Sequence, residues 1–450
     1  MAFATQRLEM LRILRLAIPL IIANVAMLGM EVVDTAMAGQ VSAIDLAGLA
    51  VGANIWLMCE MALGGIMTAV MPRVAHFRGA GEPGEITHEV QQGILMGVSI
   101  GVLLNVILLA LVPYIPLIGA EPEVTEIAQK YTTIIAFSLP ISAVIWVVFG
   151  MAEGHEMTDF AVASSLVALT LNAIFDYIFV FGKLGFPQMG GVGCAITTTV
   201  IYWLWGASCL IYAHRNKVLK SYHILTRWPG IDLKRWGAIL ALGLPIGTSL
   251  LAEEGFFSFS TLLIAPLGAV TLGAHQVTFQ IVALALMLSL GVGQATAIRA
   301  ANSLGRKEFD HARLQVFCGL AIVIGISLSL GAVTHFGNMT IPKLFSNDNT
   351  IVLLSGSLLL FAPIFLLFDA MLVWAAQTLR GFQDTKVPMM FQISAYWFIG
   401  FPLGYTLGRT ELWGKSYGIY GFWGGLFCGI ALCSMLMAIR LVIKTRPQQS

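Results

Sequence analysis

Long apolar runs recur along the whole chain and are separated by short polar segments. Crossing a hydrocarbon core about 30 Å thick takes about 20 residues of helix, and twelve of the runs reach that length. They lie near residues 14–36, 47–72, 91–112, 131–151, 160–182, 190–212, 237–261, 272–298, 314–336, 352–378, 388–408 and 416–440. The pattern predicts an all-α integral membrane protein with twelve transmembrane helices.

The composition agrees with this prediction and excludes a soluble fold. Of the 450 residues, 58% are hydrophobic and 11% are charged, and the mean hydropathy is +0.84. Average soluble chains carry about 25% charged residues, which cover their wet surface. The net charge of +1 gives no sign of nucleic-acid binding. The six cysteines lie in apolar runs without a CxxC pair, so we expect small buried side chains rather than disulfides or metal ligands.

The distribution of Lys and Arg predicts the orientation. With twelve crossings, 20 of the 25 Lys and Arg residues fall on the side that holds both termini. These are Arg7, Arg12, Arg15, Arg73, Arg78, Arg215, Lys217, Lys220, Arg227, Lys234, Arg235, Arg299, Arg306, Lys307, Arg313, Arg380, Lys386, Arg440, Lys444 and Arg446. The other side holds Lys130, Lys183, Lys343, Arg409 and Lys415. Because cytoplasmic loops are enriched in Lys and Arg, both termini are expected in the cytoplasm.

The two halves of the chain repeat each other. Residues 16–19 return as residues 242–245, and Arg73 and Gly79 return as Arg299 and Gly305, all at an offset of 226. Later matches, such as Gly154 with Gly381, lie at an offset of 227. The repeat predicts two pseudo-symmetric bundles of six helices, with a lobe at 1–220, a cytoplasmic linker at 221–236 and a second lobe at 237–450.

This repeat also indicates a class of function. Six helices are an even number, so both halves enter the membrane from the same side. Transporters built from such parallel repeats place their binding site between the halves and rock one half against the other. The basic segment from 214 to 235 is the natural linker, and its charge is typical of a solvated connector at the lipid headgroups.

Ionisable residues inside the apolar runs of the first half are candidates for function. Asp34 ends the first run, Asn172 and Asp176 share one face of the fifth, and Thr198 lies in the sixth. Carboxylate, amide and hydroxyl oxygens are suited to a small hard cation such as sodium or to a proton relay. A network of interhelical hydrogen bonds without an ion would explain the same residues.

Two acids of the second half break the symmetry of the repeat. Glu253 lies in the seventh run and Asp369 in the tenth, and the offsets place Met27 and Ser142 opposite them. A role in the scaffold would be shared by both halves, whereas these charges occur in one half only. The asymmetry favours a function in ion or substrate binding over a purely structural role.

Four further side chains are secondary candidates: Glu254, Phe365, Glu31 and Glu60. Adjacent helical residues point about 100° apart, so Glu254 and Glu253 are not expected to face the same partner. Phe365 precedes Asp369 by one turn, where its ring is placed for a cation–π contact. We expect Glu31 to share the cavity of Asp34.

The sequence offers little evidence of catalytic chemistry. The chain has no P-loop or HExxH motif, and its two GxSxG matches lie inside an apolar run (97–101) and in the polar segment between two runs (414–418), so it is not expected to be an enzyme or to be driven by ATP. No cofactor is expected, and an ion gradient remains as the source of energy. The 20 Met and 26 Phe residues suit an adaptable apolar cavity, although most such side chains face lipid or pack between helices.

Together with the repeat, four segments carry a family resemblance: residues 32–39 (VVDTAMAG), 172–177 (NAIFDY), 190–195 (GGVGCA) and 379–385 (LRGFQDT). In order and spacing they are similar to the multidrug and toxic compound extrusion (MATE) family, over nearly the whole chain. Glu253 and Asp369 resemble the acidic pair of its NorM branch. Phe365 departs from the Tyr of some members, and Cys194 stands where a small Ala or Gly is usual.

The resemblance implies a function and two sites. The implied activity is antiport, in which organic cations and amphipathic drugs leave the cell as sodium or protons enter. Its cation sites would be Asp34, Asn172, Asp176 and Thr198 in one lobe, and Glu253 and Asp369 in the other. We expect a monomer in the bacterial inner membrane, in contact with lipid. The alternative within the superfamily is a flippase for lipid-linked saccharides, which would need a cationic cavity for pyrophosphate.

Overall fold

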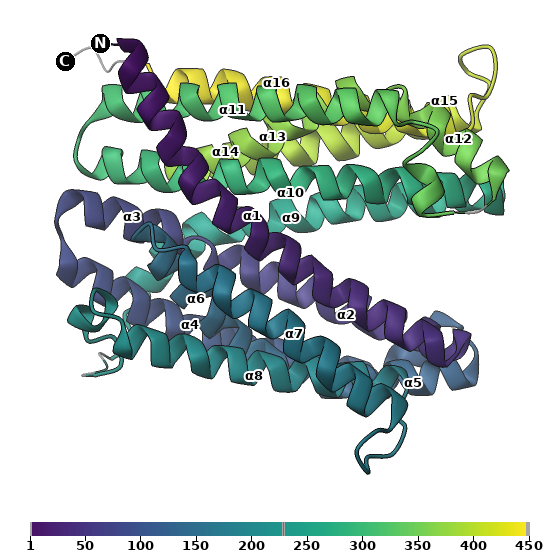
Figure 1. The fold of residues 1–450 in the computed structure, drawn as a ribbon, viewed down its shortest axis with the longest axis horizontal. Coiled ribbons are helices and arrows are strands. Elements are labelled where there is room, and N and C mark those ends of the chain that lie inside the picture. The colour runs from purple at the N-terminus through teal and green to yellow at the C-terminus, as the bar shows by residue number, and fades with distance from the viewer. Residues whose placement is uncertain (1, 227, 229, 347, 447–450) are drawn as a thin grey trace. The chain divides into compact units, whose positions relative to one another are not determined.

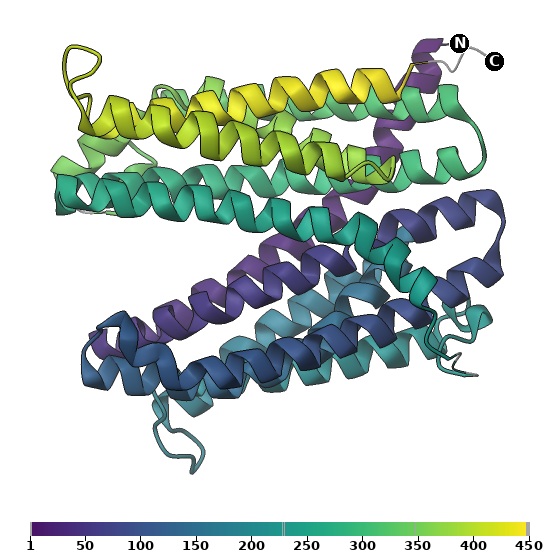
Figure 2. The ribbon, with the colours of Figure 1, turned by 180° about the vertical axis from the view of Figure 1, so that it is seen from behind.

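The computed structural model describes residues 2–226, 228, 230–346 and 348–446, and its regular elements in this part of the chain are all helices. Figures 1 and 2 show them from opposite sides. Arg227, one of the predicted cytoplasmic cations, lies outside the described residues, as do Met1 and residues 447–450 at the ends of the predicted lobes. The all-α prediction is confirmed.

The helices of the first half are α1 (Ala2–Val41), α2 (Ala43–Met67), α3 (Val70–Ala80), α4 (Pro83–Leu111), α5 (Pro122–Ile135), α6 (Leu139–Gly154), α7 (Asp159–Phe181) and α8 (Gly191–Arg215). Those of the second half are α9 (Leu233–Ile264), α10 (Ala269–Gly305), α11 (Phe309–Phe336), α12 (Asn349–Leu359), α13 (Ala362–Gly381), α14 (Lys386–Ile393), α15 (Phe401–Arg409) and α16 (Ile419–Lys444). Short 3-10 turns connect several of them, as at Ala136–Ser138 between α5 and α6.

Within the described residues, eleven helical segments are long and apolar enough to cross a membrane. The eleventh predicted run, 388–408, is divided into α14, a π-helical segment at Ser394–Gly400 and α15. Pro402, near the start of α15, has no N–H to donate to the carbonyl one turn earlier, and a wide turn is a common response to such a gap. The prediction of twelve crossings holds, with the last but one built from three pieces.

Contacts divide the chain into two compact units. Unit 1 contains Met1–Ile21 and Thr248–Ser450, and unit 2 contains Ile22–Gly247. Both division points fall inside a helix, α1 or α9, and they lie 226 residues apart, which is the offset of the repeat. Each helix has a proline just before its division point, Pro19 in α1 and Pro245 in α9. The predicted boundaries at 220 and 237 describe the repeat, whereas packing assigns the first part of each opening helix to the unit of the other half.

Small residues let these opening segments pack closely. In unit 2, a Cβ atom on Gly243 of α9 would overlap the carbonyl of Ile66 in α2. In unit 1, a Cβ atom on Gly291 of α10 would lie 3.1 Å from the carbonyl oxygen of Ala17 in α1. Close backbone approach through glycine is the usual basis of helix packing in membranes. The two contacts use nearly equivalent positions of the repeat.

One central helix organises each unit. In unit 2, α6 contacts α2, α3, α4 and α8, and most of its residues are buried. In unit 1, α13 contacts α10, α11 and α16, and lies beside α11 in Figure 1. The repeat aligns α6 with α13. These two helices carry Ser142 and Asp369, which occupy equivalent positions.

An ion-pair cluster holds the start of each opening helix. In unit 2, the buried carboxylate of Glu89 accepts hydrogen bonds from Arg73, with Nη2–Oε2 at 2.8 Å, and from Arg235 of α9, with Nη1–Oε2 at 3.1 Å. In unit 1, Arg299 Nε lies 2.5 Å from Oε1 of Glu9 in α1. Arg73 and Arg299 are equivalent in the repeat, whereas Glu9 stands where Arg235 does and Gln315 where Glu89 does, so the two units supply the acid from different helices.

Glu89→Gln is expected to destabilise unit 2 by about 3 kcal/mol, because it leaves two largely buried guanidinium groups without their carboxylate. The measurement is the free energy of unfolding in mixed detergent. Glu126→Gln is the matched control, since Glu126 forms an exposed pair with Lys130 and its loss should cost less than about 1 kcal/mol. Equal effects of the two substitutions would contradict this role of Glu89.

The segment predicted as a solvated connector is docked on unit 2. Leu219 and Ile224 are buried. Gln91 of α4 donates hydrogen bonds to the carbonyls of Ile224 and Thr226, both at 3.1 Å. His155 Nε2 lies 2.7 Å from the hydroxyl of Tyr222, and burial lowers the pKa of this imidazole. These contacts attach the connector to unit 2, while its cations Arg215, Lys217, Lys220 and Lys234 are exposed.

Candidate cation and drug site

Three helices of unit 2 bring the four predicted first-half residues together. Asn172 Nδ2 of α7 donates to Oδ1 of Asp34 in α1 at 2.9 Å. Thr198 Oγ1 of α8 donates to Oδ2 of the same carboxylate at 3.0 Å. Asp176 follows Asn172 by one turn of α7, so it lies on the same face, as the spacing predicts. All four side chains are buried.

Asp176 differs from Asp34 in its partners. Ligand atoms of Asp34, Asp176 and Cys194 all lie within 4.8 Å of one another. Both carboxylate oxygens of Asp176 are buried and make no hydrogen bond within the described chain, and the same holds for Asn172 Oδ1 and Thr197 Oγ1. Two neighbouring carboxylates in hydrocarbon repel each other unless a cation or a proton lies between them. The unpaired oxygens are the donor set that a hard cation prefers, so the site fits either ion.

Cys194 adds a thiol that the sequence did not mark as part of the site. Its Sγ donates a weak hydrogen bond to the backbone carbonyl of Asp34 at 3.6 Å. The side chain is buried, as predicted, but its sulfur lies among the possible ligand atoms of Asp34 and Asp176, a role that the sequence prediction did not give to any cysteine. It lies one turn before Thr198 on α8, and this spacing alone could have placed it at the site.

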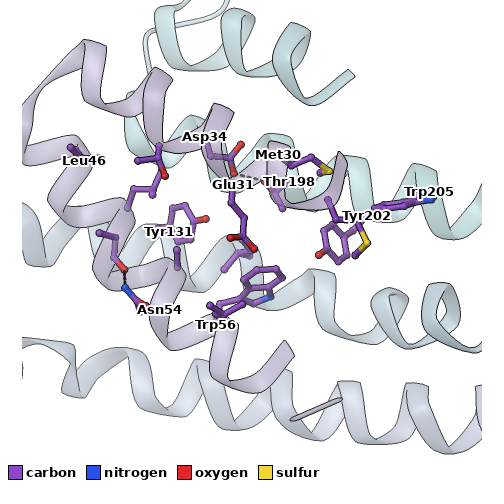
Figure 3. Close-up of a pocket in the computed structure, with 17 residues that line it drawn as sticks. Met30, Glu31, Asp34, Leu46, Asn54, Trp56, Tyr131, Thr198, Tyr202 and Trp205 are labelled. Atoms are coloured by element: carbon purple, nitrogen blue, oxygen red, sulfur yellow. Dashed lines mark hydrogen bonds between the residues drawn. The ribbon is translucent and has the colours of Figure 1, made fainter. Parts of the chain in front are cut away.

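The candidate cation site opens onto a pocket of about 270 Å³ (Figure 3). Asp34 and Thr198 line it together with Glu31, whose carboxylate extends between Tyr131 and Tyr202 in the view. Glu31 therefore shares the cavity of Asp34. Most of the remaining lining is apolar or aromatic, as is usual for a site that binds a small organic molecule.

Four aromatic side chains shape this pocket: Trp56, Tyr131, Tyr202 and Trp205. Trp56 and Tyr202 pack edge to face with ring centroids 5.8 Å apart, and Tyr202 and Trp205 do so at 6.3 Å. The lining includes two carboxylates and no Lys or Arg. Acids and aromatic faces attract lipophilic cations through charge and cation–π contacts. Sequence reasoning missed the four aromatics, because aromatic residues are as common on lipid-facing surfaces.

Unit 1 places the predicted second-half pair close enough to interact electrostatically. Glu253 Oε2 of α9 accepts a hydrogen bond from Gln392 Nε2 of α14 at 3.2 Å. Both carboxylate oxygens of Asp369 in α13 are buried, and among the described residues they have no hydrogen-bond donor. Glu253 therefore has a hydrogen-bond donor, whereas Asp369 has none within the described chain and needs a cation or a proton to balance its charge.

Three further side chains lie around this pair, and none of them donates a hydrogen bond to Asp369 in the described chain. Arg380 is near enough to interact with the charge of Glu253, but its Nη1 donates to Gln377 at 3.2 Å. Phe365 packs against Trp423, with ring centroids 5.3 Å apart. Glu254 accepts a hydrogen bond from Ser258 at 3.3 Å, whereas Glu253 accepts one from Gln392, so the two adjacent acids have different partners, as the helical geometry predicts.

The intramembrane acids are not neutralised by fixed basic partners. Asp34, Asp176, Glu253 and Asp369 form no salt bridge with Lys or Arg in the part of the chain that the structure describes. Glu60 of α2 is also buried, accepts hydrogen bonds from Ser142 and Trp146, and is not among the side chains that line the pocket. Arg380 balances part of the charge of Glu253, whereas Asp34, Asp176 and Asp369 have no fixed base beside them within the described chain.

A family model confirms the relationship that the motifs suggest. The MatE model matches residues 19–178 and again residues 245–406, two segments that begin 226 residues apart. The chain belongs to the MATE family. Among curated relatives, the multidrug resistance protein NorM of Photobacterium profundum is 34% identical over 97% of this chain and 95% of its own length. The multidrug resistance protein MdtK of Pectobacterium atrosepticum is 32% identical over 95% of this chain and 93% of its own.

Solved MATE transporters share the fold of this family member. A mutant of the Vibrio cholerae MATE transporter VcmN superposes with a TM-score of 0.89, at 18% identity, over 99% of both chains. The eukaryotic MATE transporter AtDTX14 gives 0.87 at 20% identity over 97% of this chain and 96% of its own. The two-lobe arrangement of twelve crossings is therefore that of the family, and the chain is a multi-pass membrane protein.

Proposed function

We propose that this MATE family member is a secondary active multidrug efflux transporter. It exports organic cations and amphipathic drugs in exchange for sodium or protons. The observation that carries the proposal is the buried pair of Asp34 and Asp176, with unpaired oxygens beside an acidic and aromatic pocket. The names of the NorM and MdtK relatives support the class of substrate.

The coupling follows from competition for the same carboxylates. A drug cation in the pocket is attracted by Asp34 and Glu31 and held against the aromatic rings. Entry of sodium or protons at Asp34 and Asp176 neutralises their charge and removes that attraction. The exchange moves drug outward only if the two orientations of the protein differ in their affinity for the drug and the ion.

The location follows from the charges outside the membrane. We infer a bacterial inner-membrane protein with both termini in the cytoplasm, since 20 of the 25 Lys and Arg residues fall on that side. The ion-pair clusters of Glu89 and Glu9 then lie at the cytoplasmic ends of the helices. We infer that the protein acts as a monomer.

The alternative of a flippase for lipid-linked saccharides is disfavoured by the pocket. A pyrophosphate group requires Lys or Arg donors, whereas the side chains that line this cavity include Asp34 and Glu31 and no base. An enzyme would need a reactive constellation, and the site offers carboxylates that bind and release ions.

Drug efflux into or out of proteoliposomes tests the proposal. We expect ethidium to move against its concentration gradient when a sodium gradient of opposite direction is imposed at equal pH, or when a proton gradient of opposite direction is imposed without sodium. Liposomes that contain the Asp34→Asn variant provide the comparison. We expect their ethidium transport to equal that of liposomes without protein. Absence of transport by the unaltered protein under both gradients would overturn the proposal.

A further inference from the structure

Glu60 is a buried acid that the cation site of unit 2 does not use. It lies on α2, one turn after the pocket residue Trp56, and 7% of it is exposed. Its two oxygens have separate partners on α6: Ser142 Oγ at 2.8 Å from Oε2 and Trp146 Nε1 at 3.0 Å from Oε1. Both partners are neutral, so no fixed charge balances an ionised Glu60.

The hydrogen bonds at Ser142 fit a carboxyl group that carries a proton. The Ser142 hydroxyl has one hydrogen but lies within bonding distance of two oxygens, Glu60 Oε2 at 2.8 Å and the backbone carbonyl of Leu139 at 2.9 Å. When Ser142 donates to Leu139, a protonated Glu60 donates to Ser142 and every contact is satisfied. When Glu60 loses its proton, the Ser142 hydrogen turns to Oε2. The site therefore accommodates both protonation states with one hydroxyl rotation.

The repeat relates this acid to the one in unit 1. Ser142 of α6 is equivalent to Asp369 of α13, and it is the residue that bonds to Glu60. Glu60 itself is equivalent to Leu286 of α10. Of these two pairs of equivalent positions, unit 2 has its acid on α2 (Glu60) and unit 1 has its acid on α13 (Asp369). The sequence alone suggests that Asp369 has no acidic counterpart, and the structure supplies one through the Glu60–Ser142 bond.

The titratable groups near Glu60 are weak acids. The helices packed against α2, namely α4, α5, α6 and α8, place no Lys, Arg or His against its carboxyl group in the described chain, while Glu31 and Asp34 of α1 lie beyond Tyr202 in the pocket. The titratable side chains that interact with it electrostatically are Cys59 on α2 and Tyr202 of α8. Tyr202 also lines the pocket, so Glu60 and the pocket share this neighbour.

We propose that Glu60 is a further proton-carrying residue of the transport cycle, one helical turn from the pocket and separate from the Asp34 and Asp176 site. The inference rests on the proposed antiport and deepens it by assigning a proton, not sodium, to this position. The O–H bond of Glu60 breaks when a drug cation enters the pocket, and the proton passes to water. The carboxylate then adds its charge to the attraction for the drug.

Glu60→Gln separates this role from a structural one. A Gln side chain reproduces the bonds of the protonated acid, because its Oε1 accepts from Trp146 and its Nε2 donates to Ser142. We expect an unchanged Tm and proton-driven ethidium transport at least about tenfold slower. The infrared difference spectrum on ethidium binding should lose one carboxyl C=O band. Glu60→Asp, which keeps a titratable group, should restore part of the transport, whereas Glu126→Gln at the exposed pair with Lys130 should change nothing.

The outcomes distinguish Glu60 from the function as a whole. Unaltered transport and an unaltered infrared spectrum in Glu60→Gln would overturn the role of Glu60 and leave the antiport standing. The role of Glu60 is overturned in the same way if the natural protein transports ethidium on a sodium gradient but shows no carboxyl band that depends on Glu60. A loss of Tm with equal losses of transport in both Glu60→Gln and Glu60→Asp would make the residue structural. Absence of transport by the natural protein under either gradient counts against the antiport itself.

Discussion

Asp176→Asn is expected to reduce drug efflux to the level of cells that lack the protein. The carboxylate of Asp176 has no hydrogen-bond donor within the described chain, so its interaction with a cation is its main contribution to the site. An amide removes that charge and weakens binding of the coupling ion by at least about tenfold. Whole-cell ethidium efflux and ion binding to the purified protein are the measurements.

A second aspartate on the same helix provides the control for Asp176→Asn. Asp159 is exposed in the first turn of α7, so Asp159→Asn changes the same chemical group outside the cation site. Its efflux should equal that of the natural protein at equal expression. If Asp176→Asn also transports normally, the Asp34 and Asp176 pair does not couple ion and drug.

Asp369→Asn is expected to abolish efflux as completely, because it removes the unpaired acid of unit 1. Glu253→Gln should affect folding less than Asp369→Asn does, since Gln392 can donate a hydrogen bond to Gln as well as to Glu at position 253. The measurement is drug resistance of cells with matched membrane levels of each variant. Asp310→Asn, at an exposed position of α11, is the control.

Ion binding measured in both Asp176→Asn and Asp369→Asn tests which unit binds the coupling ion. Loss of ion binding in only one variant would identify the unit that binds the coupling ion. Normal resistance in Asp369→Asn would contradict a transport role for the acid pair of unit 1.

The sequence predicted the contents of the cation site better than its geometry. Asn172 and Asp176 lie on one face of α7 because helical spacing requires it. That Asp34 bonds to both Asn172 and Thr198 depends on how α1, α7 and α8 pack, which periodicity does not encode. The hydrophobic runs likewise predicted twelve crossings but not the division of the last but one, because hydropathy does not register a local wide turn such as the one before Pro402.

Other features had no distinct signal in the sequence. Trp56 and Tyr202 line the pocket, yet single aromatic residues in apolar runs also face lipid, so the sequence does not distinguish the two cases. The count of Arg and Lys placed Arg73 and Arg299 on the cytoplasmic side. It did not show that each binds an acid brought in by packing, Glu89 in unit 2 and Glu9 in unit 1. Such partners are distant in sequence, so only the fold brings them together.

Competition between drug and ion for the site tests the central claim most directly. The measurement is the dissociation constant of a fluorescent lipophilic cation, such as ethidium, on the purified protein at increasing sodium and, separately, at increasing proton concentration. We expect the constant to rise in proportion to one of these ions in the natural protein and to become independent of it in Asp176→Asn. A constant that no concentration of either ion changes in the natural protein would contradict the claim that the buried acids serve drug and ion in turn.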